Sequence, residues 1–328
     1  MQKPTINIAY TNGVIAAREK RLLKDKILRF CELSPSEAFR ALLESGYGGG
    51  AETASSAYDY EKLIVREEEL LDQFIREYSP SGSILSYLLS PRDFHNAKAL
   101  IKAASLGEDA QKMLAPEGLI SIPLLQECVE NGDFAPLEAL NQTLRETCEK
   151  ATELLKEEHS GAKVGDIFEK ASYLYLQNTV RFSPVLKKLL TAKTDMTNIL
   201  IAFRAKDGEI AMDKYLPGGK LKEEQLKLLA DSDVETALKA FAATPHLAFV
   251  KSCFLAKEKG LPLTEAERIR DGYDETFFAK RKYELQNKEP FLYYVYRRKT
   301  ENVNVRIIFA CLLAGMSETE IKKRLRAF

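Results

Sequence analysis

The feature that most constrains this chain is a pattern that it repeats at intervals of roughly one hundred residues. In each copy an acidic residue is followed three positions later by an asparagine and then by an apolar stretch. The acids are Asp93, Asp195 and Glu301, and the asparagines are Asn96, Asn198 and Asn304. A fainter copy opens the chain at Tyr10-Thr-Asn12. Such self-similarity predicts a fold built from similar units packed side by side.

The residues around each copy repeat as well. A proline lies upstream of each acid (Pro80, Pro184, Pro290), and a stretch with helical character precedes each proline (61–78, 166–182, 274–287). A glycine follows each asparagine at Gly118, Gly219 and Gly315. These flanks divide the chain into three predicted helical repeats at 1–106, 107–207 and 208–328. Three such bundles can form a curved row or close into a ring about a pseudo-threefold axis, and sequence alone does not choose between them.

Helical signals dominate the chain, and we predict an all-α fold. Ser34-Pro-Ser-Glu37 has the serine, proline and glutamate that typically begin a helix, and Ser/Thr-x-x-Glu recurs at Ser232, Thr264 and Ser317. From Leu63 to Tyr78 apolar residues recur three, four or seven positions apart, as one face of a helix requires. No alternating run bounded by hairpin turns indicates a sheet.

Composition excludes several classes of protein. Lys plus Arg and Asp plus Glu both number 48, which gives no global electrostatic reason to bind nucleic acid or an anionic membrane. The longest apolar run, 307–316, falls short of the roughly 20 residues that span a bilayer. Five scattered cysteines without a CxxC pair indicate buried, reduced thiols. We therefore expect a cytoplasmic protein, which can still dock on a membrane complex.

No motif indicates catalysis, a metal site or a cofactor. His95, His159 and His246 are isolated, without a second ligand at helical spacing. Leu216-Pro-Gly-Gly-Lys220 lacks the remaining residues of a phosphate-binding loop, and a turn is the better interpretation. The acidic run 67–69 is typical of the solvated face of a helix.

The repeated acid and asparagine have a functional and a structural interpretation. A repeated binding or metal site is the functional one. We favour the structural one, because active sites are rarely triplicated within a chain: the acid lies in the first turn of a helix, and the asparagine bonds to a neighbouring helix or turn. Arg297, Arg298 and Lys299 are expected on the turn leading to Glu301, as a patch that contacts a partner protein.

Several segments resemble the C subunit of archaeal and bacterial A/V-type ATPases (ATP synthases), the counterpart of the d subunit of eukaryotic V-ATPases. They are 90–103 (SPRDFHNAKALIKA), 194–200 (TDMTNIL) and 293–308 (YYVYRRKTENVNVRII). The resemblance spans essentially the whole chain. It implies a funnel of three helical domains about a pseudo-threefold axis. It also implies a non-catalytic central-stalk protein that couples stalk subunits D and F to the membrane proteolipid ring, for ion transport linked to ATP hydrolysis or synthesis.

The resemblance implies a place on the cytoplasmic face of the membrane, with no nucleic acid, cofactor or small-molecule substrate. Two other functions compete with it. A generic helical-repeat adaptor with unrelated partners is what the repeats alone support. A helical enzyme would need a convergent set of titratable residues, which no motif provides.

Overall fold

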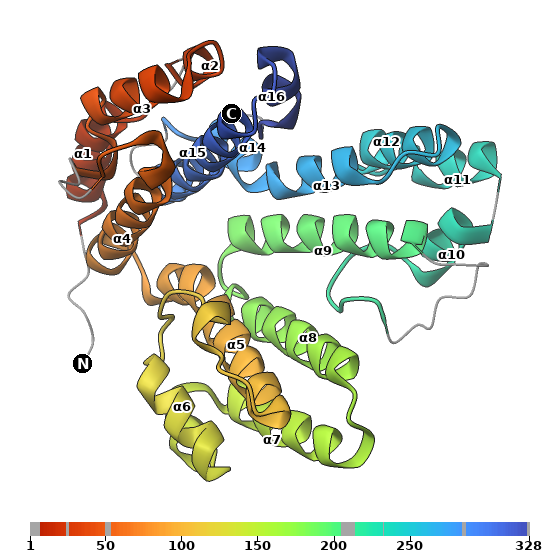
Figure 1. Cartoon of the computed structure of the whole chain (residues 1–328). Coiled ribbons are helices and arrows are strands. Elements are labelled where there is room, and N and C mark those ends of the chain that lie inside the picture. Colours follow the sequence, from red (N-terminus) through yellow and green to blue (C-terminus); the bar gives the residue numbers. More distant parts are fainter. Residues whose placement is uncertain are drawn as a thin grey trace. The chain divides into compact units, whose positions relative to one another are not determined.

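A computed structural model describes residues 7–23, 26–49, 54–204, 214–231, 233–283 and 287–326 of the chain. All regular elements in these ranges are helices, and none is a strand (Figure 1). The structure thus confirms the all-α prediction. Over the same residues, no helix combines the length and the apolar character that crossing a membrane requires.

The contacts within the chain divide it into two compact units. Unit 1 consists of Met1–Ser81 together with Glu267–Phe328, and unit 2 consists of Gly82–Ala266. This division does not test the three predicted repeats, which stay a prediction.

Unit 1 is organised around one long helix, α15 (Glu289–Leu313), which packs against helices from both ends of the chain. Those helices are α1 (Ile8–Glu19), α2 (Lys26–Phe30), α3 (Pro35–Glu44), α4 (Tyr60–Tyr78), α14 (Tyr273–Ala279) and α16 (Glu318–Arg324). The short 3-10 helices η1 (Tyr47–Gly49) and η2 (Ala57–Asp59) connect α3 to α4. Helix α13 (Thr264–Asp271) crosses the division between the units.

Unit 2 contains two long helices, and each packs against several shorter ones, as α15 does in unit 1. Helix α5 (Gly82–Leu106) packs against α6 (Ile122–Asn131), α7 (Glu138–Glu158) and α8 (Gly161–Thr179). Helix α9 (Pro184–Arg204) packs against α10 (Glu223–Asp231) and α12 (Leu247–Glu258), and α11 (Val234–Phe241) packs against both α10 and α12. The 3-10 helices are η3 (Gln111–Met113) and η4 (Ala135–Leu137).

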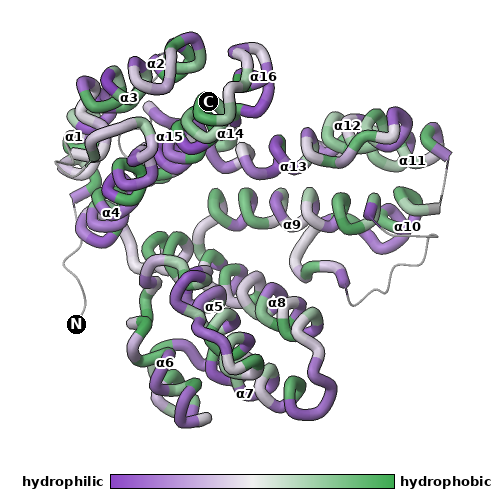
Figure 2. The backbone as a smooth tube through the Cα atoms, viewed as in Figure 1, coloured by the Kyte–Doolittle hydropathy of each residue, from purple (hydrophilic) through white to green (hydrophobic). Residues whose placement is uncertain are grey.

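The three long helices are buried along much of their length. In α5 and in α15, 13 of 25 residues are buried, and in α9, 11 of 21. The surrounding helices mix hydrophobic and hydrophilic residues along their length, as helices with one buried face do (Figure 2). The long helices are therefore the elements against which each unit assembles.

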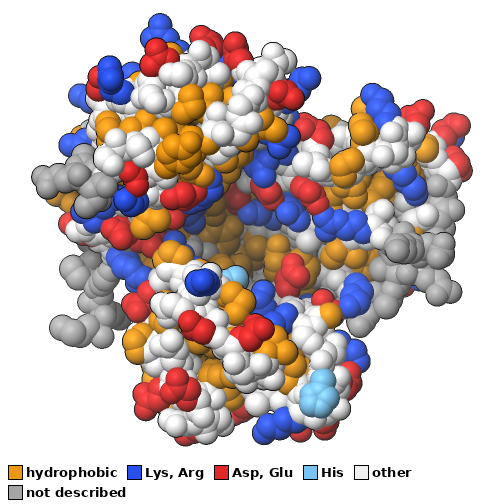
Figure 3. Space-filling view, in the orientation of Figure 1, with side chains coloured by type: hydrophobic (Ala, Val, Ile, Leu, Met, Phe, Trp, Pro, Cys, Tyr) orange, Lys and Arg blue, Asp and Glu red, His pale blue; other side chains and the backbone are white. Residues whose placement is uncertain are grey.

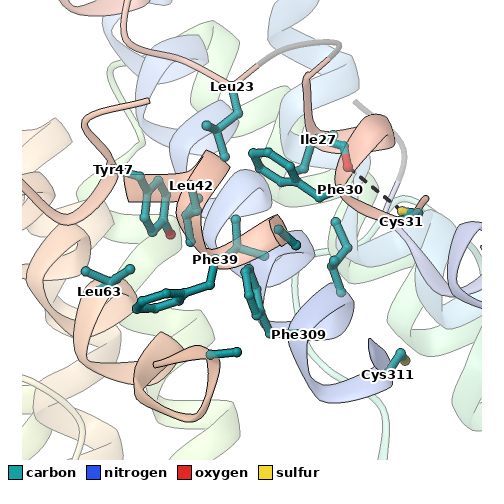
Figure 4. Close-up of a cluster of buried hydrophobic side chains, with 14 of the residues drawn as sticks. Leu23, Ile27, Phe30, Cys31, Phe39, Leu42, Tyr47, Leu63, Phe309 and Cys311 are labelled. Carbon is teal, nitrogen blue, oxygen red and sulfur yellow. Dashed lines mark hydrogen bonds between the residues drawn. The ribbon is translucent and has the colours of Figure 1, made fainter. Parts of the chain in front are cut away.

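The main core of unit 1 joins the two ends of the chain. Leu23, Ile27, Phe39 and Leu42 from the N-terminal segment lie in one cluster with Phe309 of α15 (Figure 4). The Phe309 ring lies 6.3 Å from that of Phe39, edge to face. Burial of these apolar side chains holds the N-terminal helices on α15.

The ends of the helices follow local sequence signals in most places. Capping boxes at Ser34 and Ser317 are confirmed. Helix α11 is capped by Asp233, not Ser232, and Ser232 itself lies outside the described residues. Helix α13 begins at Thr264 itself. Helix α4 ends at Tyr78, directly before Ser79 and Pro80, as predicted, because proline cannot continue a preceding helix. The predicted stretches 166–182 and 274–287 were too long: α8 ends at Thr179 and α14 at Ala279, and Pro184 and Pro290 instead lie at the starts of α9 and α15.

The five cysteines are all free and buried, which confirms the prediction of buried thiols. Cys31 Sγ donates a weak hydrogen bond to the carbonyl oxygen of Ile27 at 3.9 Å (Figure 4). Burial raises the pKa of Cys253 to about 12. Because the thiolate is the reactive form, such a thiol is a poor nucleophile.

We predict that Phe309→Ala lowers the free energy of unfolding of unit 1 by about 3–5 kcal/mol, because it opens a cavity in a fully buried cluster. Urea denaturation followed by circular dichroism measures this loss. Tyr58→Ala is the control, since the Tyr58 side chain is 79% exposed. Equal denaturation midpoints for the two variants would contradict the packing described for Phe309.

Candidate functional site

Each long helix carries one buried acid and one buried asparagine whose side chains bond to backbone groups of a distant loop. We name each such pair a helix–loop tie. The first tie is Asp93 and Asn96 of α5, the second is Asp195 and Asn198 of α9, and the third is Glu301 and Asn304 of α15. The six residues are those that the repeated pattern singled out.

The first tie fixes the loop between α5 and α6. The Asn96 amide donates to the Ala115 carbonyl at 3.2 Å and accepts from the Ala115 N–H at 2.8 Å. The Asp93 carboxylate accepts from the N–H of Leu119 at 3.1 Å and from the N–H of Ile120 at 3.0 Å. Two side chains therefore hold four backbone groups of one loop.

The second tie repeats this geometry on α9. Asn198 donates to the Leu216 carbonyl at 2.9 Å and accepts from the Leu216 N–H at 2.8 Å. One oxygen of Asp195 accepts from the N–H of Lys220 at 2.7 Å and from that of Leu221 at 3.1 Å. The loop that precedes α10 is thus held in the same manner as the loop that precedes α6.

The third tie differs in its acidic half. Asn304 donates to the Arg326 carbonyl at 3.1 Å and accepts from the Arg326 N–H at 2.7 Å. Glu301, by contrast, accepts from the N–H of Leu23, near the other end of the chain, at 2.5 Å. Its second oxygen accepts from Arg298 at 2.6 Å. This tie therefore joins the two chain segments that form unit 1.

These bonds explain why charged side chains lie at buried positions. Asp93, Asp195 and Glu301 are 1%, 2% and 4% exposed. Burying an unpaired carboxylate is costly, whereas a carboxylate that accepts from backbone N–H groups forms strong charge-assisted bonds. Each asparagine satisfies both polar atoms of its amide on a single backbone residue.

The acids lie in the middle of their helices, so the prediction that they occupy the first turn was wrong. Helix α5 begins at Gly82 and continues through Pro91 to Asp93 and beyond. The N–H groups bound by the three acids lie just ahead of α6, α10 and α2 respectively. Each carboxylate therefore lies near the start of another helix, where the helix dipole also favours negative charge.

Two of the three expected glycines are required by the ties. A Cβ atom on Gly118 would lie 2.2 Å from Oδ1 of Asp93, and one on Gly219 would lie 2.3 Å from Oδ1 of Asp195. Neither distance is possible for real atoms, so only glycine allows the loop to approach the carboxylate. Gly315 has a different role: it follows the end of α15 with φ of 71° and has open space around it.

The predicted contact patch is largely engaged inside unit 1. Its residues lie within α15, not on a turn before it. Arg298 is 4% exposed, and its guanidinium lies 3.7 Å from Glu67 in addition to its bond with Glu301. Burial acts to lower the pKa of Arg298, but these two carboxylates outweigh it and the pKa is raised. This burial argues against direct partner contact by Arg298.

The other two cations of the patch lie at the side of α15 that faces α14. Arg297 forms an ion pair with Glu275 of α14 at 2.8 Å. Burial raises the pKa of Glu275, and hydrogen bonds with Arg297 and Thr300 oppose that shift. The ammonium group of Lys299 lies 5.6 Å from the centre of the Tyr296 ring. Partner contact by this patch stays a prediction, carried mainly by Lys299.

Sequence reasoning missed several contacts of the ties. Glu67, expected on a solvated face, is buried and accepts from the Gly48 N–H at 3.0 Å. His246, interpreted as isolated, lies with Nε2 at 3.3 Å from the second oxygen of Asp195. Neither partner is close in sequence, so no local spacing could have indicated them.

The ties hold backbone rather than preparing a reaction. Both oxygens of each carboxylate have a partner, which leaves none directed into a cavity. Among the residues that the structure describes, no three His, Cys, Asp or Glu side chains are grouped so as to hold a metal ion. The arrangement is suited to fixing loops against rigid helices.

Comparisons with known proteins find similarity along nearly the whole chain. A family model described as ATP synthase (C/AC39) subunit matches residues 11–324. The C subunit of the V-type sodium ATPase of Enterococcus hirae is 20% identical over 327 residues, which cover 96% of this chain and 97% of the relative. The C subunit of the V-type ATP synthase of Thermus thermophilus, in two strains, is 23% identical over 335 residues, which cover 97% of this chain and 98% of the relative.

We predict that Asn198→Leu lowers the free energy of unfolding of unit 2 by about 1–3 kcal/mol, because it leaves the buried N–H and carbonyl of Leu216 without partners. Thermal or urea denaturation measures the loss. Asn178→Leu is the matched control, since Asn178 is exposed on α8. Stability equal to that of the control would mean that the second tie does not stabilise the loop.

We also predict that Gly219→Ala destabilises unit 2 by about 1–3 kcal/mol, because its methyl group forces Asp195 and the loop apart. Gly161→Ala is the control: this glycine begins α8, and no atom lies within 4 Å of the position that the added methyl group would take. The control is expected to be as stable as the parent chain or slightly more so. If both variants denature at the same urea concentration, the close approach of Gly219 to Asp195 is not tight.

Proposed function

The chain belongs to the ATP synthase (C/AC39) subunit family, and from this premise we propose that it joins the central stalk of a V/A-type rotary ATPase to the membrane ring. The observation that carries the proposal is the match of the family model over residues 11–324, together with relatives matched over nearly their full length. The proposed partners are stalk subunits D and F on one side and the proteolipid ring on the other.

The helix–loop ties support a mechanical role. An element that transmits torque must resist deformation, and packed helix bundles are stiff. Loops are usually the softest part of such bundles. In this chain the loops ahead of α6 and α10 are each held by bonds from a buried acid and a buried asparagine. The third tie bonds the N-terminal and C-terminal segments of unit 1 to each other through α15.

We propose that the protein performs no catalysis and that nucleotide chemistry takes place elsewhere in the complex. The buried carboxylates are engaged by backbone N–H groups or by arginine, and burial raises the pKa of the Cys148 and Cys253 thiols. We place the protein at the cytoplasmic face of the membrane, as part of the complex, without a cofactor or small-molecule substrate of its own.

The surface is suited to contact with several protein partners. Lys and Arg side chains are interspersed with Asp and Glu side chains over the face shown in Figure 3. The whole chain has a formal net charge of +0. Partners must therefore be recognised by local patches, because no large field of one sign attracts them.

We predict that an affinity-tagged copy of the chain, purified in mild detergent from its native membranes, carries with it the stalk subunits and the proteolipid. Mass spectrometry identifies them. Deleting the gene should leave ATP hydrolysis by the catalytic part of the complex but abolish ATP-driven ion transport in membrane vesicles, because the shaft is no longer joined to the ring.

An untagged strain is the control for the purification. Recovery of neither the stalk subunits nor the proteolipid would overturn the proposed function. Recovery of unrelated proteins in their place would support the helical-repeat adaptor. Ion transport that persists in the deletion strain would show that the chain does not couple stalk and ring.

A further inference from the structure

The turn between α8 and α9 exposes a large aromatic side chain. We name residues 180–188 the α8–α9 corner. Phe182 in this corner is 85% exposed, more than the other large hydrophobic side chains of the described residues. A single exposed hydrophobic residue is common on protein surfaces and needs no explanation by itself. The charged side chains and the hollow around Phe182, described next, distinguish it from such an isolated residue.

The α8–α9 corner is strongly positive. The Arg181 guanidinium lies 4.6 Å from the centre of the Phe182 ring, and Lys187 and Lys188 are exposed in the first turns of α9. None of the three cations forms an ion pair within the part of the chain that the structure describes. No acidic residue occurs from position 180 to 194, and Asp195 is buried in the second tie.

A hollow of about 440 Å³ adjoins the exposed aromatic residue. Arg181 lines it and also contacts the Phe182 ring, so the two features are continuous. Its other lining residues include Thr143 and Asn178, whose hydroxyl and amide can bond to a peptide backbone. The side chains of Asn141, Gln142 and Thr179, which also line it, already bond within the chain. Its acidic residue, Glu138, forms an ion pair with Arg145, which also pairs with Glu149. The one negative charge that this group leaves in excess is outnumbered by the three cations of the corner.

The end of α14 shows the same combination of side chains. Tyr283 is 80% exposed, and the Lys282 ammonium group lies 5.0 Å from the centre of its ring. Lys280 is exposed beside them. Both places follow a helix that leads to a tie-bearing long helix, α9 or α15. An exposed aromatic ring held by a cation therefore occurs twice at corresponding points of the chain.

We propose that the α8–α9 corner is a docking point for an acidic segment of a partner protein. The Phe182 ring supplies an apolar anchor, and the three cations attract carboxylates. The Thr143 hydroxyl and the Asn178 amide of the hollow bond to the bound backbone. Aromatic and arginine side chains are frequent energetic centres of protein interfaces. The polar hollow favours a polypeptide over a lipid surface, which would offer no backbone groups to fill it.

Photo-crosslinking in the native host tests this docking point. Phe182 is replaced by the photoreactive analogue benzoylphenylalanine, which occupies nearly the same exposed position, and the cross-linked peptide is mapped by mass spectrometry. We expect an adduct with a protein segment rich in Asp and Glu. Lys187→Glu/Lys188→Glu in the same chain should lower the adduct yield about tenfold, because the reversed charges repel that segment.

Two matched controls separate the corner from the surface in general. Benzoylphenylalanine at Tyr58, another exposed aromatic residue, should give no such adduct. Lys251→Glu/Lys259→Glu reverses two exposed charges, one on α12 and one directly after it, and should leave the yield unchanged. The docking point is overturned by a yield at Phe182 no greater than at Tyr58, by an adduct with lipid, by a segment without acidic residues, or by insensitivity to the charge reversal at 187 and 188.

The experiment also distinguishes the docking point from the proposed function. The docking point rests on the proposed function only in that the partner is expected to belong to the ATPase complex. A charge-sensitive adduct with an acidic segment of a protein outside the ATPase supports the docking point and counts against the proposed function. Absence of the adduct, with stalk and ring subunits still recovered by the tagged chain, overturns the docking point alone.

Discussion

Hydrogen bonding between buried side chains of a long helix and backbone groups of a distant loop is the interaction on which the rest of this structure depends. A carboxylate placed inside a bundle is unfavourable unless donors surround it, and the loop N–H groups are those donors. The requirement acts in both directions, because the same N–H groups would be unsatisfied without the acid. Asp93 and Asn96 thereby fix where the loop before α6 runs, and Asp195 and Asn198 do so before α10. The short helices that follow then begin from fixed points.

The third tie gives unit 1 a different construction from a chain of independent repeats. Glu301 bonds to Leu23, and Phe309 packs against Phe39, so α15 cannot complete its surroundings without the N-terminal helices. Arg298 compensates the charge of Glu301 and also faces Glu67 of α4. Contacts between residues so far apart in sequence form late in synthesis and close a large loop of chain, which is unfavourable in entropy until the core forms. Unit 1 is therefore completed only when its last helices are made.

Features that depend on neighbouring residues, such as helix ends and caps, could be predicted from the sequence. Contacts between residues far apart in the chain could not. The helix end at Tyr78 and the cap at Ser34 followed from proline and capping chemistry that acts within a few positions. The repeated acid and asparagine were visible as a pattern, but their role was misassigned, because the N–H groups of Leu119 and Lys220 become neighbours only in the fold. Arg298 and Glu67 were expected at the surface for the same reason. Each was judged from the residues next to it in sequence, whereas its burial depends on a charged partner on another helix.

The buried charges of this fold are paired inside it, so only exposed charges can contribute to the recognition of a partner protein. Inside the units, Asp93, Asp195 and Glu301 are matched by internal donors and offer nothing to a partner. On a chain with equal numbers of acidic and basic residues, specific attraction of an acidic partner must come from cations that no carboxylate of the chain already pairs with. Arg181 and Lys187 are such cations within the described residues, and they lie immediately before the helix that carries the second tie or in its first turn. A partner bound at that corner would contact the start of α9, the helix whose Asp195 and Asn198 hold the loop before α10 in place.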